Sequence, residues 1–304
     1  AIVASISGFT GDYFLQETDV QIDLTEYTII GNSEISVVPL GTGPDYGVAY
    51  EYGQTPQTFR FTRTDPGTGT LPALTVYYDV GYDGGLNSGD YSGLAAPGDS
   101  GQFTFAEDDT TFDLVLTPVL DTNDEFDETV TVTITSGSYD ISSTNDSASI
   151  DIKDAPVVKI EATDSTASEG NPVNTGRFYV SSTSGHVPGG SFTVDLEFLS
   201  TSSNPVADLN VDYTVNPSES SSPPVISFTL LDTGDFQNVT VTPINDANMS
   251  EGFEDVRLRI QDADGAAIDS ANRQATVTIA DNGGVGVPNV SVLSLIHISE
   301  PTRP

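Results

Sequence analysis

Apolar and polar residues alternate in short runs along most of the chain, and clusters of Gly, Pro, Asp and Ser separate the runs. This alternation is typical of half-buried β-strands, because successive side chains point to opposite faces of a sheet. In the first half the runs carry Phe59 and Phe61; Leu74, Val76, Tyr78 and Val80; Phe103 and Phe105; Leu114 and Leu116; Val130, Val132 and Ile134; Ile150 and Ile152. In the second half they carry Val158 and Ile160; Phe178 and Val180; Phe192, Val194, Leu196 and Phe198; Ile226, Phe228 and Leu230; Val239 and Val241; Val256, Leu258 and Ile260; Val277 and Ile279. The pattern predicts an all-β protein.

The two halves are copies of one unit. Glu51 corresponds to Glu169, and Asp154 to Asp281, at an offset that only grows along the chain. Small loop insertions in the second copy would produce such a drift. Short strands repeated at this spacing, about seven in a copy, predict two tandem immunoglobulin-like antiparallel β-sandwiches.

The repeat sets the expected domain boundaries. The modules should meet near Ala155-Pro156, where the last strand of one copy runs almost directly into the first strand of the next. So short a link should hold them end to end. The expected division is an unassigned segment at 1–33, a first module at 34–155, a second module at 156–284, the start of a truncated third repeat at 285–292, and a tail at 293–304. The tail contains LSLIHISEPTR, which resembles a translated sequencing adapter and is left out of the fold argument.

The charge of the chain is strongly one-sided, with 45 acidic against 9 basic residues and a formal net charge of −36. Such a chain is repelled by nucleic acid and by anionic membrane surfaces, since both are bound through Lys and Arg. The sequence has no cysteine, which excludes disulfides and thiol chemistry, and no apolar run long enough to span a membrane. We therefore expect neither nucleic acid as a partner nor direct membrane insertion of this fragment.

The acids gather where strands end. The densest clusters are PVLDTNDEFDE at 118–128 and PINDANMSEGFED at 243–255, each after a strand that ends in Pro. At about 5 Å and an effective dielectric of about 20, each like-charge pair costs roughly 3 kcal/mol. A divalent cation would relieve this repulsion, and an all-oxygen set of Asp and Glu favours calcium over zinc or copper.

The order of these motifs resembles the Calx-beta domain. The order is Glu-Gly after the first strand, Asp-Tyr before the middle strands, Pro-x-x-Asp followed by Glu-x-x-Glu, and an Ile-x-Asp ending. The second copy is the stronger match, through TASEG, VDYTV, PINDANMSEGFED and VTIADNG. The resemblance implies calcium ions at one end of each sandwich. The implied ligands are Glu51, Asp90, Asp121, Glu125, Glu128 and Asp154 in the first copy, with Asp124 as a possible substitute, and Glu169, Asp212, Asp246, Glu251, Glu254 and Asp281 in the second.

The chain departs from the family pattern at four places. Thr122, Ala247, Ala155 and Asn282 stand where better-endowed members carry further acids. We therefore expect one or two ions in each module, with weak affinity of about 10⁻⁴–10⁻³ M. The alternative is that the clusters are solvated turn acids, or remnants of a site that no longer binds.

Catalytic chemistry is disfavoured by the same residues. A glycosidase needs two acids across a sugar-sized cleft, whereas these acids crowd together. His186 lies in the loop SGHVPGG, which is typical of a solvated turn rather than of a Ser-His-Asp triad. The run DADG at 262–265 lacks the last ligand of an EF-hand loop and is interpreted as a turn. The sequence predicts a non-enzyme.

Three functions remain open. The first is a calcium-stiffened structural or adhesive repeat of a large secreted or cell-surface protein, with other surface proteins or glycans as possible partners. The second is a calcium-sensing regulatory module of a membrane transporter. The third is a carbohydrate-binding accessory module of a secreted enzyme, which would need an exposed aromatic platform; Tyr77, Tyr78, Tyr82 and Tyr91 are the candidates.

Overall fold

The structure, a computed structural model, describes residues 32–41, 45–65, 67, 70–81, 85–86, 88–123, 127–170, 172–245 and 252–282. Within these ranges the regular elements are strands, apart from one short 3-10 turn, η2 (Tyr52–Gln54). The all-β prediction is confirmed. The expected third repeat and the adapter-like tail lie outside the described residues, as does most of the unassigned first segment.

The first module is a sandwich of two five-stranded sheets. One sheet has the order β5-β7-β3-β1-β9 and the other the order β2-β10-β8-β4-β6. The strands are β1 (Glu34–Pro39), β2 (Val48–Tyr50), β3 (Gln57–Thr64), β4 (Leu74–Val80), β5 (Tyr91–Ser92), β6 (Ser100–Phe105), β7 (Thr111–Pro118), β8 (Glu128–Ile134), β9 (Asp140–Ile141) and β10 (Ser147–Lys153).

The second module repeats this topology strand for strand. Its sheets have the orders β15-β17-β13-β11-β19 and β12-β20-β18-β14-β16. The strands are β11 (Val157–Asp164), β12 (Thr166–Ser168), β13 (Gly176–Ser182), β14 (Ser191–Phe198), β15 (Tyr213–Asn216), β16 (Val225–Leu231), β17 (Phe236–Pro243), β18 (Phe253–Asp262), β19 (Ala267–Ile268) and β20 (Gln274–Ala280).

Each described module thus has seven long strands and three short ones. The alternation predicted all of these long strands except β1. Ile35 and Val37 of β1 are fully buried, and β1 pairs with β3. The short strands β2 and β12 escaped the pattern because three residues are too few to show a period. Both pair in parallel with the last strand of their module, β10 and β20.

The core of each module lies between its two sheets. Along β8 the burial alternates perfectly, with Val130, Val132 and Ile134 inside and threonines between them half-buried. Phe59 and Phe61 of β3 are fully buried in the first core, and Phe178 and Phe192 are buried in the second. The inward apolar face of each strand is what holds the two layers together, through loss of water from apolar surface.

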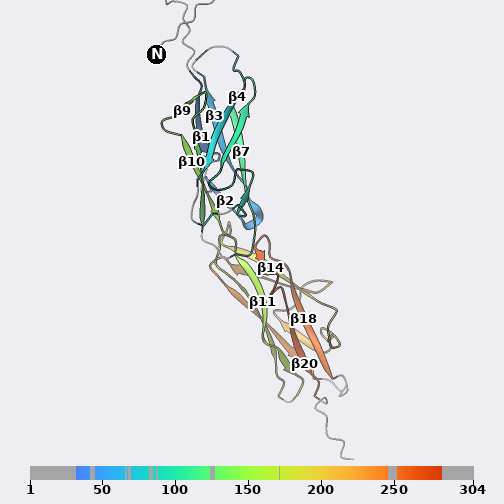
Figure 1. Cartoon of the computed structure of the whole chain (residues 1–304). Coiled ribbons are helices and arrows are strands. Elements are labelled where there is room, and N and C mark those ends of the chain that lie inside the picture. Colours follow the sequence, from blue (N-terminus) through green and yellow to red (C-terminus); the bar gives the residue numbers. More distant parts are fainter. Residues whose placement is uncertain are drawn as a thin grey trace, which may run out of the picture.

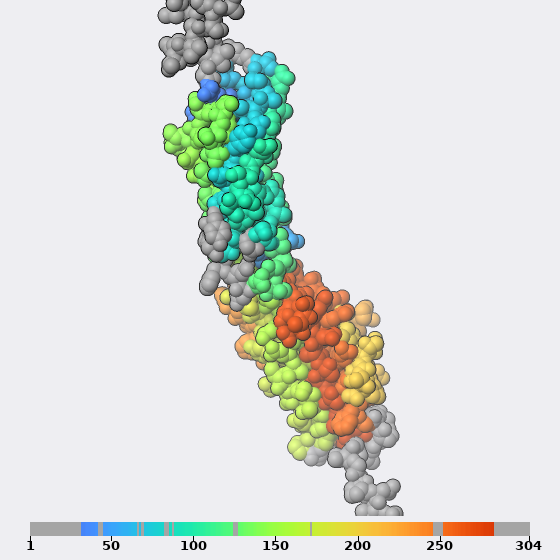
Figure 2. Space-filling model, in the orientation of Figure 1, coloured from blue at the N-terminus to red at the C-terminus, as the bar shows by residue number. Residues whose placement is uncertain are grey.

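The modules lie end to end, with the long strands of each running roughly along the axis of the molecule (Figure 1). In the space-filling view they meet as two lobes in direct contact (Figure 2). The link is buried, since Ala155 has 1% exposure and Pro156 is also buried. A Cβ on Gly185 would come within 2.4 Å of the Pro156 nitrogen, so only glycine allows the second module to approach the link this closely.

The turn η2 of the first module inserts into the junction. Tyr52 packs against the core of the second module and meets Phe192 edge-on at a ring-centroid distance of 6.4 Å. Its hydroxyl donates to Asp264 at 3.2 Å, and the neighbouring Gly53 N–H donates to the Gly265 carbonyl at 3.2 Å. The run DADG is a turn, as expected, and it also provides the surface that receives η2.

His186 makes a second set of polar contacts across the junction. The His186 N–H donates to the Asp154 carbonyl at 2.8 Å, and its Nε2 lies 3.1 Å from Asp127 Oδ1. The Lys153 ammonium is 2.8 Å from the other oxygen of Asp127. His186 is half-exposed, as its loop predicted, but it joins the two modules rather than standing alone in solvent.

We expect the substitution Tyr52→Ala to loosen the junction, because it removes the only aromatic contact described between the modules, with Phe192, and the bond to Asp264. Removal of a partly buried aromatic side chain at such a contact should cost about 1–2 kcal/mol of module docking. Small-angle X-ray scattering should then report a broader distribution of shapes. Tyr46→Ala, at an exposed tyrosine of the same module, is the matched control. Identical scattering from Tyr52→Ala and wild type would contradict this account.

Candidate metal centre

The parallel pairing of β2 with β10 brings two predicted ligands together. Tyr50 pairs with Lys153, so the next residues, Glu51 and Asp154, leave the two strands side by side. The Glu51 N–H donates to the Lys153 carbonyl at 3.0 Å and so extends the ladder by one step. The carboxyl groups of Glu51 and Asp154 are hydrogen-bonded to one another.

Three more acids arrive at the same end of the first sandwich. Glu128 begins β8, opposite Ile152 of β10. Asp90 precedes β5, and its carbonyl accepts from the Val119 N–H at 2.9 Å. Asp121 follows β7 and interacts electrostatically with Glu51, while its carboxylate accepts two hydrogen bonds from Asn123. Strand ends from both sheets thus converge on one tip, the tip that faces the second module.

The second module places the equivalent residues in the same way. The Glu169 N–H donates to the Ala280 carbonyl at 3.1 Å, which sets Glu169 beside Asp281 at the ends of β12 and β20. The Asp212 carbonyl accepts from the Ile244 N–H at 2.7 Å, as that of Asp90 does from Val119. Glu254, half-buried on β18, pairs with Ile279 of β20. This cluster lies at the tip away from the junction.

Two asparagines help to shape the tip of the second module. Asn245 donates to the Glu169 carbonyl at 2.7 Å, and Asn282 donates to the Asn245 side chain at 3.0 Å. Asn282 is one of the departures from the family pattern. Its side-chain amide ties the residues after β20 to the residues after β17.

The clustered acids are deeply buried. Ten polar or charged residues are buried in the described part of the chain, and seven of them belong to the predicted ligand set: Glu51, Asp90, Glu128, Asp154, Glu169, Asp212 and Asp281. Carboxylates are rarely buried, because they lose their hydration. Burial on this scale at two equivalent tips is not what solvated turn acids would show.

Burial and repulsion act most clearly on Glu51. Burial raises the pKa of Glu51, and Asp154 raises it further by repulsion and by the hydrogen bond, so that it reaches about 8. Asp121 adds a smaller repulsion, and a backbone hydrogen bond from Ala155 partly opposes the rise. In the absence of a cation, the protein therefore holds a proton between Glu51 and Asp154. A divalent ion could replace that proton.

Four predicted ligands, Asp124, Glu125, Asp246 and Glu251, lie outside the described residues. Among the residues that are described, no group of three or more His, Asp or Glu side chains forms an arrangement that could hold a metal ion. The predicted ligands that are described are all carboxylates, so each tip offers oxygen ligands only. The loops between β7 and β8, and between β17 and β18, carry the four remaining predicted ligands.

The sequence reasoning passed over Asp255, a buried acid next to a predicted ligand. Its carboxylate accepts hydrogen bonds from Ser202, from Asn204 at 3.0 Å and from Thr278 at 2.7 Å. Burial opposes ionisation of Asp255, but these bonds outweigh it and lower its pKa. Asp255 is satisfied by the protein and anchors the segment 202–207. Alternation along β18 gives the signal, since Glu254 and Asp255 point to opposite faces.

Two of the four tyrosines considered as an aromatic platform for a carbohydrate are not exposed to solvent. Tyr78 and Tyr91 are buried in the first core, and their hydroxyl-bearing rings are not available to a ligand. Both lie on inward-facing positions of their strands. Tyr77 is 42% exposed, and Tyr82 lies outside the described residues.

The raised pKa of Glu51 predicts a pH dependence of the calcium-free protein. Between the ordinary value of 4.5 and about 8, the folded state keeps a proton that the unfolded state has lost. The free energy of unfolding should therefore fall as the pH rises through this window, and Glu51→Gln should remove part of that fall and stabilise the protein at pH 8, on the order of 1–2 kcal/mol. Urea unfolding in EDTA at several pH values measures it. Glu107→Gln, at an exposed position, is the control, and a parallel pH profile for wild type and Glu51→Gln would refute the assignment.

The hydrogen bonds of Asp255 predict a structural role. Asp255→Ala leaves the donors of Ser202, Asn204 and Thr278 without their acceptor, and should lower the free energy of unfolding by about 2–4 kcal/mol. Chemical denaturation measures this. Asp164→Ala, at an exposed acid of the same module, should change stability little. If the two variants proved equally stable, the anchoring role would be wrong.

No family model and no curated protein matches the sequence. Solved structures that resemble the chain include CBD12 from CALX1.2, with 13% identity over 76% of this chain and 80% of that chain and a TM-score of 0.31. They also include the calcium binding domain CBD12 of CALX1.1 (13%, 73% and 79%, TM-score 0.29) and the serine-rich repeat adhesion glycoprotein Srr1 from Streptococcus agalactiae (11%, 81% and 96%, TM-score 0.24). Two of these are Calx modules, the kind of domain that the motifs resemble. Likeness at this level carries no argument of its own, and the fold rests on the strands described above.

Proposed function

We propose that the two modules bind calcium at equivalent tips and serve as structural or adhesive repeats of a larger secreted or cell-surface protein. The observation that carries the proposal is the burial of carboxylates. Seven predicted ligands are buried at matching strand ends, in a chain with nine Lys and Arg residues for 45 acids. Calcium is the cation that such an oxygen-only set suits best.

In the first module Glu51, Asp90, Asp121, Glu128 and Asp154 would hold the ion, together with Asp124 and Glu125. In the second, the ligands would be Glu169, Asp212, Glu254 and Asp281, together with Asp246 and Glu251. The ion supplies positive charge that offsets the repulsion among the acids. The pairing of the short strands β2 and β12 with the last strand of each module holds the carboxylates in fixed positions. One or two ions in each module remain the expectation, because four positions of the family pattern carry no acid.

The position of the first cluster links calcium to the shape of the module string. Asp154 directly precedes the buried link Ala155-Pro156, and its carbonyl accepts from His186 of the second module. Asp127, between two predicted ligands, contacts His186 as well. An ion that fixes this tip would fix the surface on which the second module sits. Calcium would then stiffen the string, which supports a mechanical role over a catalytic one.

Calcium should raise the melting temperature of the chain, because it binds the folded state in preference to the unfolded one. At 100 times the dissociation constant the gain is about 2.7 kcal/mol for each independent site. Differential scanning calorimetry in millimolar CaCl₂ and in EDTA measures it, and isothermal titration gives the stoichiometry. Asp154→Asn and Asp281→Asn should each remove the binding of one module, whereas Glu107→Gln should remove none.

Magnesium at the same concentration is the control for non-specific screening, since it demands near-ideal octahedral geometry and gives up its hydration water reluctantly. Equal stabilisation by magnesium and calcium would argue for general charge screening. A melting temperature unmoved by calcium, with no heat of binding up to ten times the expected dissociation constant, would end the proposal.

A further inference from the structure

One outer surface of the second module combines aromatic, hydroxyl and charged side chains. It is the solvent side of the sheet β17-β13-β11-β19, at the end that faces the junction. The register places Phe236, Ser181 and Lys159 in one row across three strands, since Ser181 pairs with both. Asp269 continues the row beyond β11, where its N–H donates to the Val158 carbonyl at 2.9 Å.

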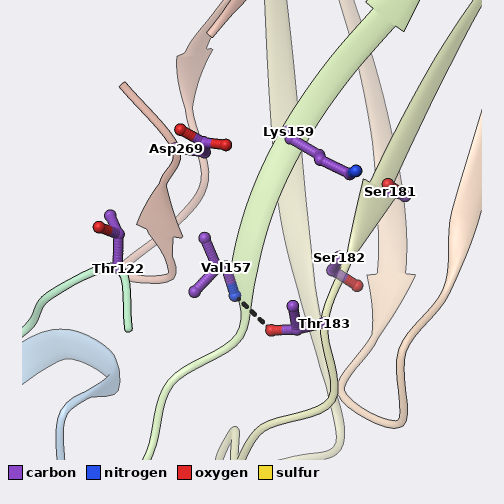
Figure 3. Close-up of a pocket in the computed structure, with 7 residues that line it drawn as sticks. All are labelled: Thr122, Val157, Lys159, Ser181, Ser182, Thr183 and Asp269. Carbon is purple, nitrogen blue, oxygen red and sulfur yellow. Dashed lines mark hydrogen bonds between the residues drawn. The ribbon is translucent and has the colours of Figure 1, made fainter. Parts of the chain in front are cut away.

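A groove of about 260 Å³ lies over this row. Its floor and sides are formed by Lys159, Ser181, Thr183 and Asp269, and Thr122 of the first module lies across from β11 and β19 (Figure 3). The Lys159 side chain extends toward Ser181 in this view. Hydroxyls, one ammonium and one carboxylate thus surround the space, so that a ligand could both donate and accept hydrogen bonds there.

An aromatic stack borders the groove on the same face. Tyr179 and Phe236 stack at a ring-centroid distance of 5.1 Å and an interplanar angle of 28°. They stand diagonally across β13 and β17, because Tyr179 pairs with Asn238 and Ser181 with Phe236. Phe236 is 52% exposed. Cross-strand stacking contributes to sheet stability, but that contribution does not require so much of the ring to remain in water.

We propose that this face binds a neutral oligosaccharide. Sugar rings present an apolar face of C–H groups that packs on aromatic rings, and a rim of hydroxyls that both donate and accept hydrogen bonds. The stacked rings of Tyr179 and Phe236 would pack against the apolar face of one sugar ring. In the groove, Ser181, Lys159 and Asp269 would form hydrogen bonds with the hydroxyls of the neighbouring sugar unit.

The charge of the molecule selects among possible ligands. A net charge of −36 repels acidic polysaccharides and nucleic acids. The Lys159 ammonium is 2.9 Å from Glu161, so the groove offers no uncompensated cation to a sulfate or carboxylate. The groove is also smaller than the pockets of about 300–1,000 Å³ typical of apolar drug-sized ligands. A neutral glycan fits all three constraints.

None of the residues that line this site is a proposed calcium ligand, although Thr122 directly follows Asp121, and the aromatic stack belongs to the second module alone. The tyrosines that the sequence suggested for a platform, Tyr77, Tyr78, Tyr82 and Tyr91, all lie in the first module. Tyr179 was not among them, because the alternation along β13 marks it only as outward-facing. The pairing with β17 that brings Phe236 beside it is a feature of the tertiary fold.

The test is titration of the full chain with neutral hexasaccharides of the cello-, xylo-, manno-, laminari- and chito- series, and with hexagalacturonate as an anionic arm. We expect a neutral hexasaccharide to bind, and Tyr179→Ala and Phe236→Ala each to weaken it at least about tenfold, as truncation of a central aromatic anchor does. Tyr179→Phe should retain binding. Tyr46→Ala, at an exposed tyrosine of the first module, should leave it unchanged.

Thermal melts of each variant separate lost binding from lost folding. Repeating the titration in EDTA separates this proposal from the calcium proposal, since neither the stack nor Lys159 and Asp269 is among the predicted ligands. The proposal is overturned if none of the neutral hexasaccharides binds at 10 mM, if only hexagalacturonate binds, or if folded Tyr179→Ala and Phe236→Ala bind as wild type does.

Discussion

Repulsion between the buried carboxylates of Glu51 and Asp154 is the constraint around which the tip of the first module is organised, and the second module buries equivalent acids at its own tip. In each module, short strands and loop ends carry acids to one tip, where they lose most of their contact with water. Ionised groups held so close in a medium of low dielectric repel strongly. The calcium-free protein lowers this cost by keeping a proton on the Glu51–Asp154 pair. A bound cation would lower it for the whole cluster.

The strand order explains why the acids cannot move apart. The parallel strands β2 and β12 add an edge to the last strand of their module and end in step with it. The hydrogen bond from the Glu51 N–H to Lys153, and its counterpart from Glu169 to Ala280, extend that pairing to the acidic residues themselves. Separating the carboxylates would break the ladder. The apolar cores, held by residues such as Phe59 and Phe178, stabilise a geometry that the tip alone would not adopt.

Much of this arrangement could be predicted from the sequence, because period-two alternation and motif order are local signals. The strands around Val130 and Val256, the internal repeat and the gathering of acids at strand ends all follow from them. Two kinds of feature could not be predicted. Strands of two or three residues, such as β2, show no period. Roles that depend on packing were also hidden: alternation places Glu254 and Asp255 on opposite faces, but nothing local shows that Ser202, Asn204 and Thr278 bind the Asp255 carboxylate.

At the junction, residues in and next to the first acidic tip contact the second module directly. The first acidic tip faces the second module, and the residues that follow or flank it, Asp127 and Asp154, are the ones that contact His186. On another side, Tyr52, the residue next to Glu51, contacts Phe192 and Asp264. Any change in the charge of the first tip therefore acts on atoms that hold the second module in place. Ions bound at the first tip would therefore act on the angle between the two modules as well as on the stability of the first.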